Sequence, residues 1–350
     1  MVNSRQIEAF SEVALHLHLT VVTDAFGDSA IPLLKELLTY VGRLYHRLPE
    51  DVYRGQIVVV KSLDDSPVAD GGLLYGSPDA VALPQSGRVM FQTFSNGAVR
   101  VWSSLDSIDL SKLAQSAIVY TFDQGKDTFF AGSRQATMLK LVAQAFSSNF
   151  GVPRFHSLKD ALEDYRLRTA RHTGCKILEK IWFDSNRIFF IPKPESLMRD
   201  SLVQFLNNVL GSEAQVRPEQ NVNETEPVDI FIHWYMSQHL ALIEVKWMGK
   251  SHNGVKITTE YGEARANHGA KQLADYLDEN YRTAPLHAAR AYLIVFDARR
   301  ANTAADTRTI SRPDGLKFEN REITFQPAYH VDRLDFEVPL RFFCEPKCDA

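Results

Sequence analysis

Hydrophobic periodicity divides the first half of the chain into one clear helix and a series of short strands. Residues 31–48 carry apolar side chains at three- and four-residue spacing, which predicts an amphipathic helix. Helical spacing returns at residues 133–150 and 157–169, whereas the mixed spacing of residues 6–23 is compatible with a strand or a helix. Short apolar runs bounded by turn-forming residues predict four strands, at residues 56–60, 89–93, 99–102 and 117–122.

The second half of the chain has a more regular order of elements. Residues 194–210 predict a helix with one apolar face, and Gly211 ends it. The pattern then predicts three strands, a helix and a buried strand, at residues 214–217, 228–234, 240–247, 263–281 and 291–296. We therefore expect an α/β protein with an α+β N-terminal domain at residues 1–190 and a C-terminal α/β domain at residues 191–350.

Composition narrows the class of protein. The 350 residues suffice for two domains, and 45% hydrophobic with 23% charged residues is ordinary for a globular chain. A net charge of −4 gives no global positive field, but a nucleic-acid site needs only a local basic groove. Three scattered cysteines indicate a reducing compartment. Neither a signal peptide nor an apolar run of roughly 18 residues is present, so we expect a cytoplasmic protein without a membrane partner.

Three ionisable residues interrupt apolar strands in the second half. Asp229 lies in the predicted strand 228–234, and Glu244 and Lys246 lie in the strand 240–247. If these strands pair as a hairpin, Asp229 can approach Glu244. Glu244 and Lys246 are two residues apart, so they project to the same face. Burying an unpaired carboxylate is costly, and such groups are therefore paired, metal-bound or placed at an exposed edge.

Two interpretations of these residues are open. A Glu-x-Lys tripeptide is common, and a salt pair on a half-exposed strand accounts for it without any function. Alternatively, the two carboxylates supply hard oxygen ligands for Mg²⁺, which polarises a phosphoryl group and makes a water more acidic. A lysine on the same face then positions that water or steadies the developing charge. This second interpretation predicts hydrolysis of a phosphodiester bond.

The spacing of these residues resembles the PD-(D/E)xK nuclease superfamily, which has the restriction-endonuclease-like fold. Asp229 is followed by 14 residues and then by Glu244-Val245-Lys246. The predicted helix–strand–strand–strand–helix–strand order of residues 192–296 is similar to the core of that fold. Gln272 and Tyr276 match the Q-x3-Y motif of RecB-like members, and they share a helical face because they are four residues apart. One departure is that Val228 separates Pro227 from Asp229.

The resemblance implies a role for each matched residue. Asp229, Glu244 and the carbonyl of Val245 would hold Mg²⁺, for which Mn²⁺ can substitute, and Lys246 would orient the attacking water. Gln272 and Tyr276 would complete the catalytic set. The superfamily often adds an acid on the first core helix, for which Glu195 is the candidate metal ligand and Asp200 the alternative. Four basic residues are candidates for contacts with nucleic-acid phosphates, or for a solvated charged face: Lys250, Lys256, Arg265 and Lys271.

We therefore expect a metal-dependent endonuclease that cuts DNA, with a role in restriction, phage defence or repair. The alternative is a catalytically silent nucleic-acid-binding or scaffolding protein with the same fold. Many nucleases of this kind act as pairs, so a homodimer is compatible with the resemblance. The N-terminal domain carries no recognisable chemistry. Its role is regulation, recognition or dimerisation, and a regulatory ligand or a partner protein is the expected binding partner there.

Overall fold

The computed structural model describes residues 17–103, 107–139, 148–152, 154–211, 213–221, 227–235, 237–284 and 287–349. The chain divides into two compact units between His156 and Ser157. The division lies earlier than the boundary that we expected at residue 190, because residues after 156 pack with the C-terminal half. The hydroxyl of Tyr165 lies 2.7 Å from that of Ser201, and its ring packs against Phe205 and Phe342.

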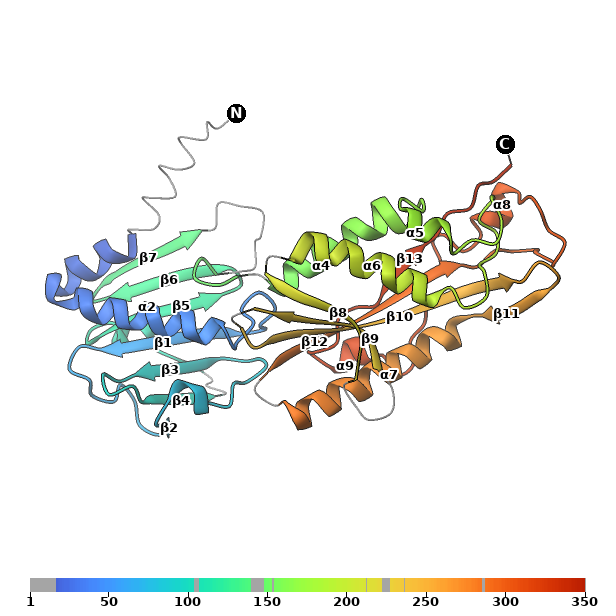
Figure 1. Ribbon diagram of the computed structural model, residues 1–350. Coiled ribbons are helices and arrows are strands. Elements are labelled where there is room, and N and C mark those ends of the chain that lie inside the picture. The colour runs from blue at the N-terminus through green and yellow to red at the C-terminus, as the bar shows by residue number, and fades with distance from the viewer. Residues whose placement is uncertain are drawn as a thin grey trace, which may run out of the picture. The chain divides into compact units, whose positions relative to one another are not determined.

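The first unit is built on a seven-stranded sheet (Figure 1) with the order β2-β4-β3-β1-β5-β6-β7. Among these strands only β1 and β3 pair in parallel. Residues 17–26 are helical, which settles part of the open segment 6–23, whose residues up to 16 lie outside the described residues. The strands are β1 (Gln56–Ser62), β2 (Leu73–Tyr75), β3 (Val89–Thr93), β4 (Val99–Ser103), β5 (Ala117–Asp123), β6 (Lys126–Ala131) and β7 (Arg134–Leu139). The helices are η1 (Asp28–Ala30), α2 (Ile31–Tyr45), η2 (Pro78–Ala80) and α3 (Leu110–Leu113).

The helix predicted at residues 133–150 is wrong in both parts that the structure describes, since residues 134–139 form a strand and residues 148–150 are not helical. Arg134–Leu139 is strand β7, which pairs antiparallel with β6 through a tight turn at Gly132, where φ is +59°. Ala136 and Met138 are buried on alternate positions, so the residues follow the two-residue period of a strand. Residues 140–147, also within the predicted helix, lie outside the described residues.

The second unit contains a six-stranded sheet with the order β13-β12-β10-β9-β8 and β11 paired to β10 (Figure 1). The pairs β10–β12 and β12–β13 are parallel, and the other pairs are antiparallel. Its strands are β8 (Ala214–Asn221), β9 (Pro227–Trp234), β10 (His239–His252), β11 (Ile257–Tyr261), β12 (Ala288–Ala298) and β13 (Leu340–Phe343). Its helices are α4 (Arg154–Asp164), the π-helix η3 (Tyr165–Ala170), α5 (Lys176–Glu179), α6 (Glu195–Leu210), α7 (Glu263–Thr283), α8 (Arg312–Gly315) and α9 (Tyr329–Asp332).

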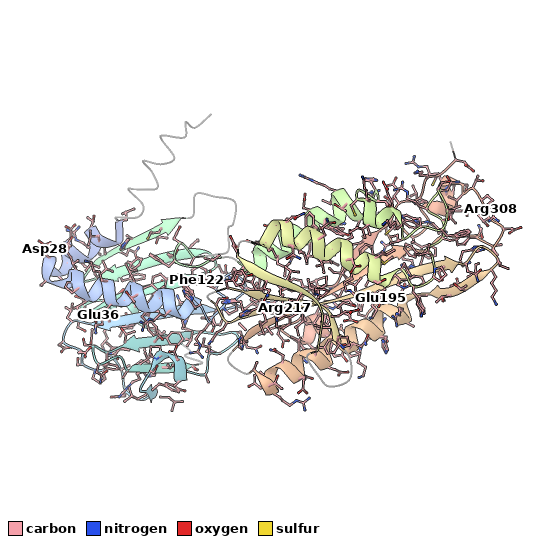
Figure 2. All side chains as sticks on the ribbon, in the orientation of Figure 1. Asp28, Glu36, Phe122, Glu195, Arg217 and Arg308 are labelled. Atoms are coloured by element: carbon pink, nitrogen blue, oxygen red, sulfur yellow. The ribbon has the colours of Figure 1, made fainter. Side chains whose placement is uncertain are left out.

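Helices α6 and α7 frame the sheet of the second unit, and both were predicted at these residues. Figure 1 shows them on opposite sides of the strands, and Figure 2 marks Glu195 at the beginning of α6. Leu242 and Met248 of β10 pack with Ala266 and Leu273 of α7, so the even-numbered side chains of β10 face that helix. The C-terminal part is therefore α/β, as expected, with a mixed sheet covered by helices, whereas β11 and β13 were not predicted.

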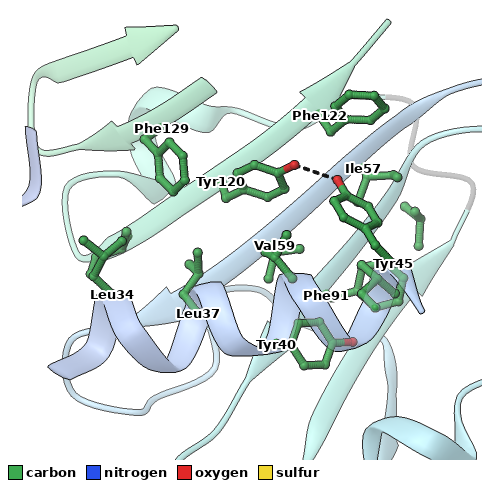
Figure 3. Packing of buried hydrophobic residues seen from close by; sticks show 14 of the residues in the cluster. Leu34, Leu37, Tyr40, Tyr45, Ile57, Val59, Phe91, Tyr120, Phe122 and Phe129 are labelled. Carbon is green, nitrogen blue, oxygen red and sulfur yellow. Dashed lines mark hydrogen bonds between the residues drawn. The ribbon is translucent and has the colours of Figure 1, made fainter. Parts of the chain in front are cut away.

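Each unit has its own apolar core. In the first unit, Leu34 and Leu37 of α2 pack against Ile57 and Val59 of the central strand β1 (Figure 3). The hydroxyls of Tyr45 and Tyr120 meet at 2.6 Å within this core, and burial raises the pKa of both phenols. In the part of the chain that the structure describes, no helix is both long enough and apolar enough to cross a membrane.

Candidate active site

Asp229 lies where strands β9 and β10 stop pairing with each other. Their antiparallel register ends with Ile230 opposite Ile243, so Asp229 and Glu244 are the next residues in register. Asp229 Oδ2 accepts a hydrogen bond from the backbone N–H of Val245 at 2.9 Å. The N–H and C=O of one residue in a strand point to the same side. The carbonyl of Val245 is therefore directed toward the strand that carries Asp229.

Glu244 and Lys246 form a buried ion pair on the next strand. Lys246 Nζ donates to Glu244 Oε1, and the two side chains are only 3% and 4% exposed. Gly269 of α7 lies directly on the lysine, because a Cβ atom there would come within 2.6 Å of Lys246 Cγ. The sequence did not indicate this glycine as part of the site. The packing confirms that Glu244 and Lys246 share a face of β10.

Helix α6 brings a third carboxylate to the same place. Glu195 Oε1 lies 3.7 Å from Lys246 Nζ, and its Oε2 is 3.1 Å from Arg265 on α7. Asp200, the alternative to Glu195, is exposed and lies 3.9 Å from Arg199 Nε. The structure therefore places Glu195, and not Asp200, beside the lysine.

Arg199 is a member of the site that sequence reasoning missed. Its NH1 group lies 2.7 Å from Glu219 Oε1 on β8 and 3.5 Å from Asp229 Oδ1 on β9. The signal that could have found it is local, since Arg199 is four residues after Glu195 and thus lies on the same face of α6. Its contact with Asp229, however, depends on how the helix packs on the sheet.

The charges of the site alternate in sign except at one place. The charged side chains follow one another in the order Glu219, Arg199, Asp229, Glu244, Lys246, Glu195, Arg265. Each is ion-paired to the next, except Asp229 to Glu244. Two carboxylates are thus consecutive where Asp229 meets Glu244, and the regular alternation would place a cation between them.

Electrostatics at this junction oppose two bare negative charges. Burial raises the pKa of Asp229, and the positive charge of Lys246 only partly offsets that effect. Burial, followed by the neighbouring charge of Asp229, raises the pKa of Glu244 to about 8. Glu244 Oε2 is buried and accepts no hydrogen bond from the described residues. A divalent cation would remove the repulsion and would use this oxygen.

The oxygen atoms at this junction are of the type that Mg²⁺ binds. Among the residues that the structure describes, no three His, Cys, Asp or Glu side chains are grouped as a metal site. Mg²⁺ commonly uses only one or two carboxylates and keeps several water molecules. Asp229, Glu244 and the carbonyl of Val245 therefore suit Mg²⁺, and the set would not suit zinc, which prefers four nitrogen or sulfur ligands.

The two residues of the Q-x3-Y motif lie on the inner side of α7. Tyr276 is buried in the core between α7 and the sheet, and its hydroxyl donates to the carbonyl of Pro227 at 3.2 Å. Gln272 is half-buried one turn earlier. Tyr276 thus ties α7 to the first residue of β9, two residues before Asp229.

Of the four basic candidates for phosphate contacts, only Arg265 reaches the site. Lys250 donates to the carbonyl of Thr303 at 2.8 Å, near the end of β10. Lys271 pairs with Asp275 on the exposed side of α7, at 2.8 Å. Lys256 is exposed in the turn between β10 and β11. Arg265, by contrast, pairs with Glu195 beside Lys246.

Three comparisons with known proteins identified no relative of this chain. The chain matches no protein-family model, no curated protein and no solved structure. The site is accordingly defined by its own geometry: a buried acidic pair on two diverging strands, with a cation on each side. That arrangement is the basis for the function proposed below.

Proposed function

We propose that the second unit is a metal-dependent endonuclease that hydrolyses phosphodiester bonds of DNA. The observation that carries the proposal is the junction of Asp229 and Glu244, two buried carboxylates that follow each other in the strand register. A salt pair alone accounts for Glu244 and Lys246, but it leaves Asp229 beside them and Glu244 Oε2 without a hydrogen bond from any residue that the structure describes. A metal ion at the junction would account for Asp229, for the Glu244–Lys246 pair and for Glu244 Oε2.

The order of elements supports the proposal. Helix α6, strands β8, β9 and β10, helix α7 and strand β12 follow one another as in the core of the PD-(D/E)xK superfamily. The proposed ligands come from the second and third of these strands, and Glu195 comes from the first helix. We infer a restriction-endonuclease-like fold for this unit on that basis.

Each residue of the site has a distinct task in the proposed reaction. Asp229, Glu244 and the carbonyl of Val245 would hold Mg²⁺. When bound, Mg²⁺ supplies polarisation of the phosphoryl oxygens and makes water more acidic. Lys246 lies between Glu244 and Glu195, from where it would donate to the attacking water and keep it in line. Glu195 and Arg265 position the lysine, and Tyr276 positions the strand that carries Asp229.

Cleavage of supercoiled plasmid tests the proposal directly. The full-length protein should convert plasmid to nicked or linear forms with Mg²⁺ or Mn²⁺, and chelation with EDTA should stop the reaction. Asp229→Asn and Lys246→Ala should each reduce the rate by about 100-fold or more, as expected for loss of a group that stabilises the transition state. Asp332→Asn and Lys317→Ala are the matched controls, because both residues are exposed in the same unit.

Calorimetric titration with Mn²⁺ distinguishes the proposal from its alternative. The wild type should bind Mn²⁺, whereas Asp229→Asn should bind it much more weakly. DNA binding without any Mn²⁺ binding or cleavage would favour a silent nucleic-acid-binding protein. Equal cleavage by the wild type and both site variants would exclude this site as the catalytic centre.

A further inference from the structure

Arg199 has more hydrogen-bonding capacity than its two carboxylates use. A guanidinium presents five N–H donors in a planar fork. Both ion pairs of Arg199 with Glu219 and Asp229 involve the single nitrogen NH1. Its Nε is buried and donates to no acceptor among the described residues, since Asp200 at 3.9 Å is beyond hydrogen-bond distance.

The arginine is anchored on the side away from the proposed metal. Glu219, at 2.7 Å, is the closer of its two partners, and Asp229 lies at 3.5 Å. Glu219 has φ +49°, a left-handed conformation that L-residues other than glycine adopt at a cost, and its register position in β8 is opposite Asp229. Glu219 is therefore placed to hold the guanidinium beside Asp229 from the neighbouring strand.

The other two cations of the site lie on the Glu244 side of the acidic junction. Lys246 lies between Glu244 and Glu195, and Arg265 pairs with Glu195 and lies over the ring of Tyr261 at 5.0 Å. On the Asp229 side of the acidic junction, Arg199 is the corresponding cation, with its side chain 14% exposed. A phosphate bound at the junction would meet Lys246 on one side and Arg199 on the other.

We propose that Arg199 binds a phosphate of the DNA strand at the site, donating from its guanidinium to a non-bridging oxygen. The proposal rests on the proposed nuclease function. A planar guanidinium matches two phosphate oxygens at once, which a point charge does not. Arg199 is therefore a substrate-contacting residue, and Glu219 is the residue that positions it.

The salt dependence of DNA binding tests this role. Binding of a short duplex in Mg²⁺ is measured in a Lys246→Ala background, which prevents cleavage, with and without Arg199→Gln. Loss of one phosphate contact should reduce the slope of log affinity against log salt by about one. In the otherwise wild-type enzyme, Arg199→Gln should raise KM about tenfold, as expected for loss of a charged hydrogen bond to substrate.

Arg282→Gln is the matched control. Arg282 pairs with Glu279 at the far end of α7, roughly 25 Å along the helix from Arg265 by the rise of 1.5 Å per residue. The Arg282→Gln variant should leave the salt slope of DNA binding unchanged. If Arg199 only neutralised Asp229, Arg199→Gln would change Mn²⁺ affinity but would leave the salt slope as it was.

The outcomes separate this proposal from the function on which it rests. If the wild type cuts plasmid and Arg199→Gln keeps the slope, the role of Arg199 is overturned and the nuclease stands. If the parent protein neither binds nor cuts DNA, both proposals fall. If Arg199→Gln does not fold, Arg199→Lys is measured instead. The salt slope of DNA binding should then persist while the affinity for DNA falls. An unchanged affinity for DNA would overturn the proposal.

Discussion

Glu244 combines two features that are costly together, deep burial and a neighbouring negative charge. Its side chain is almost inaccessible, and among the described residues its one hydrogen bond comes from Lys246. Burial and the charge of Asp229 raise the pKa of this carboxyl to about 8, so the folded, metal-free protein binds a proton there more readily than the unfolded chain does. In the unfolded chain the same group is ionised above its ordinary pKa of about 4.5. The proton is therefore linked to folding.

This linkage predicts an unusual pH dependence of stability. Between about pH 4.5 and pH 8, the folded state keeps a proton that the unfolded state has lost, so the contribution of Glu244 decreases as pH rises. In EDTA, this difference in proton binding at Glu244 should lower the free energy of unfolding by about 1.4 kcal/mol for each pH unit in this window. Glu244→Gln should remove that contribution, as measured by urea unfolding at several pH values. Parallel pH profiles for the two proteins would contradict the prediction.

Gly269 gives a second prediction at the scale of single residues. Alanine normally favours a helix over glycine by about 1 kcal/mol. Here its Cβ would lie 2.6 Å from Lys246 Cγ and 3.1 Å from Leu293 Cδ1, so the lysine must move. We expect Gly269→Ala to lower the cleavage rate on the order of 100-fold through misplacement of Lys246. Mn²⁺ binding should persist, because both carboxylates remain.

The control for this substitution is Gly42 of α2, where a Cβ would meet nothing within 4 Å. Gly42→Ala should stabilise the protein by about 0.5–1 kcal/mol and leave cleavage unchanged. A Gly269→Ala protein with full activity would show that Lys246 has no required position.

The sequence predicted the members of the site that are close together along the chain or matched by a motif. Asp229, Glu244 and Lys246 interrupt apolar strands, and that local pattern is visible without a structure. Arg199 and Gly269 have no such signal. From the sequence alone, Arg199 is interpreted as a solvent-exposed helix residue. Gly269 is interpreted as a residue that destabilises its helix. Their roles arise only when α6 and α7 pack on the sheet, which no local pattern encodes.

At the scale of elements, periodicity predicted long segments well and short ones poorly. Helices α2, α6 and α7 have sustained apolar faces, and they occur where expected. Strand β7 was mistaken for a helix, because its sequence contains good helix formers and its pairing with β6 overrides that propensity. Strand β13 has only four residues, and its parallel partner β12 lies more than forty residues earlier in the chain.

Tyr276 links two of these elements and allows a prediction about their coupling. Its hydroxyl donates to the carbonyl of Pro227, so Tyr276→Phe removes a bond between α7 and the first residue of β9. We expect a loss of about 1 kcal/mol in the free energy of unfolding. Mn²⁺ affinity should fall a few-fold, because Asp229 is less well positioned. Tyr281→Phe, on the exposed side of the same helix, should change neither quantity; equal effects of the two variants would exclude the coupling.

At the scale of the whole molecule, the two units have separate cores and different chemistry. All the residues of the proposed active site belong to the second unit. The first unit contains a buried polar network instead. Asp127 accepts hydrogen bonds from Tyr120, from Ser148 and from the backbone and side chain of Asn149, at 2.6–2.8 Å. This network ties residues 148–149 to the sheet of the first unit. A regulatory ligand or partner protein at the N-terminal domain stays a prediction.

Separate cores predict two unfolding transitions that respond to different changes. Asp127→Ala leaves several buried donors without an acceptor, which costs about 2–3 kcal/mol and should lower one transition by roughly 10 °C. Mn²⁺ at about 100 times its Kd should add about 2.7 kcal/mol to the other transition and raise it by several degrees. Scanning calorimetry of both proteins, with and without Mn²⁺, measures the two effects. If Mn²⁺ and Asp127→Ala shift the same transition, then the units unfold together, and a signal sensed by the first unit would reach the proposed active site through their shared stability.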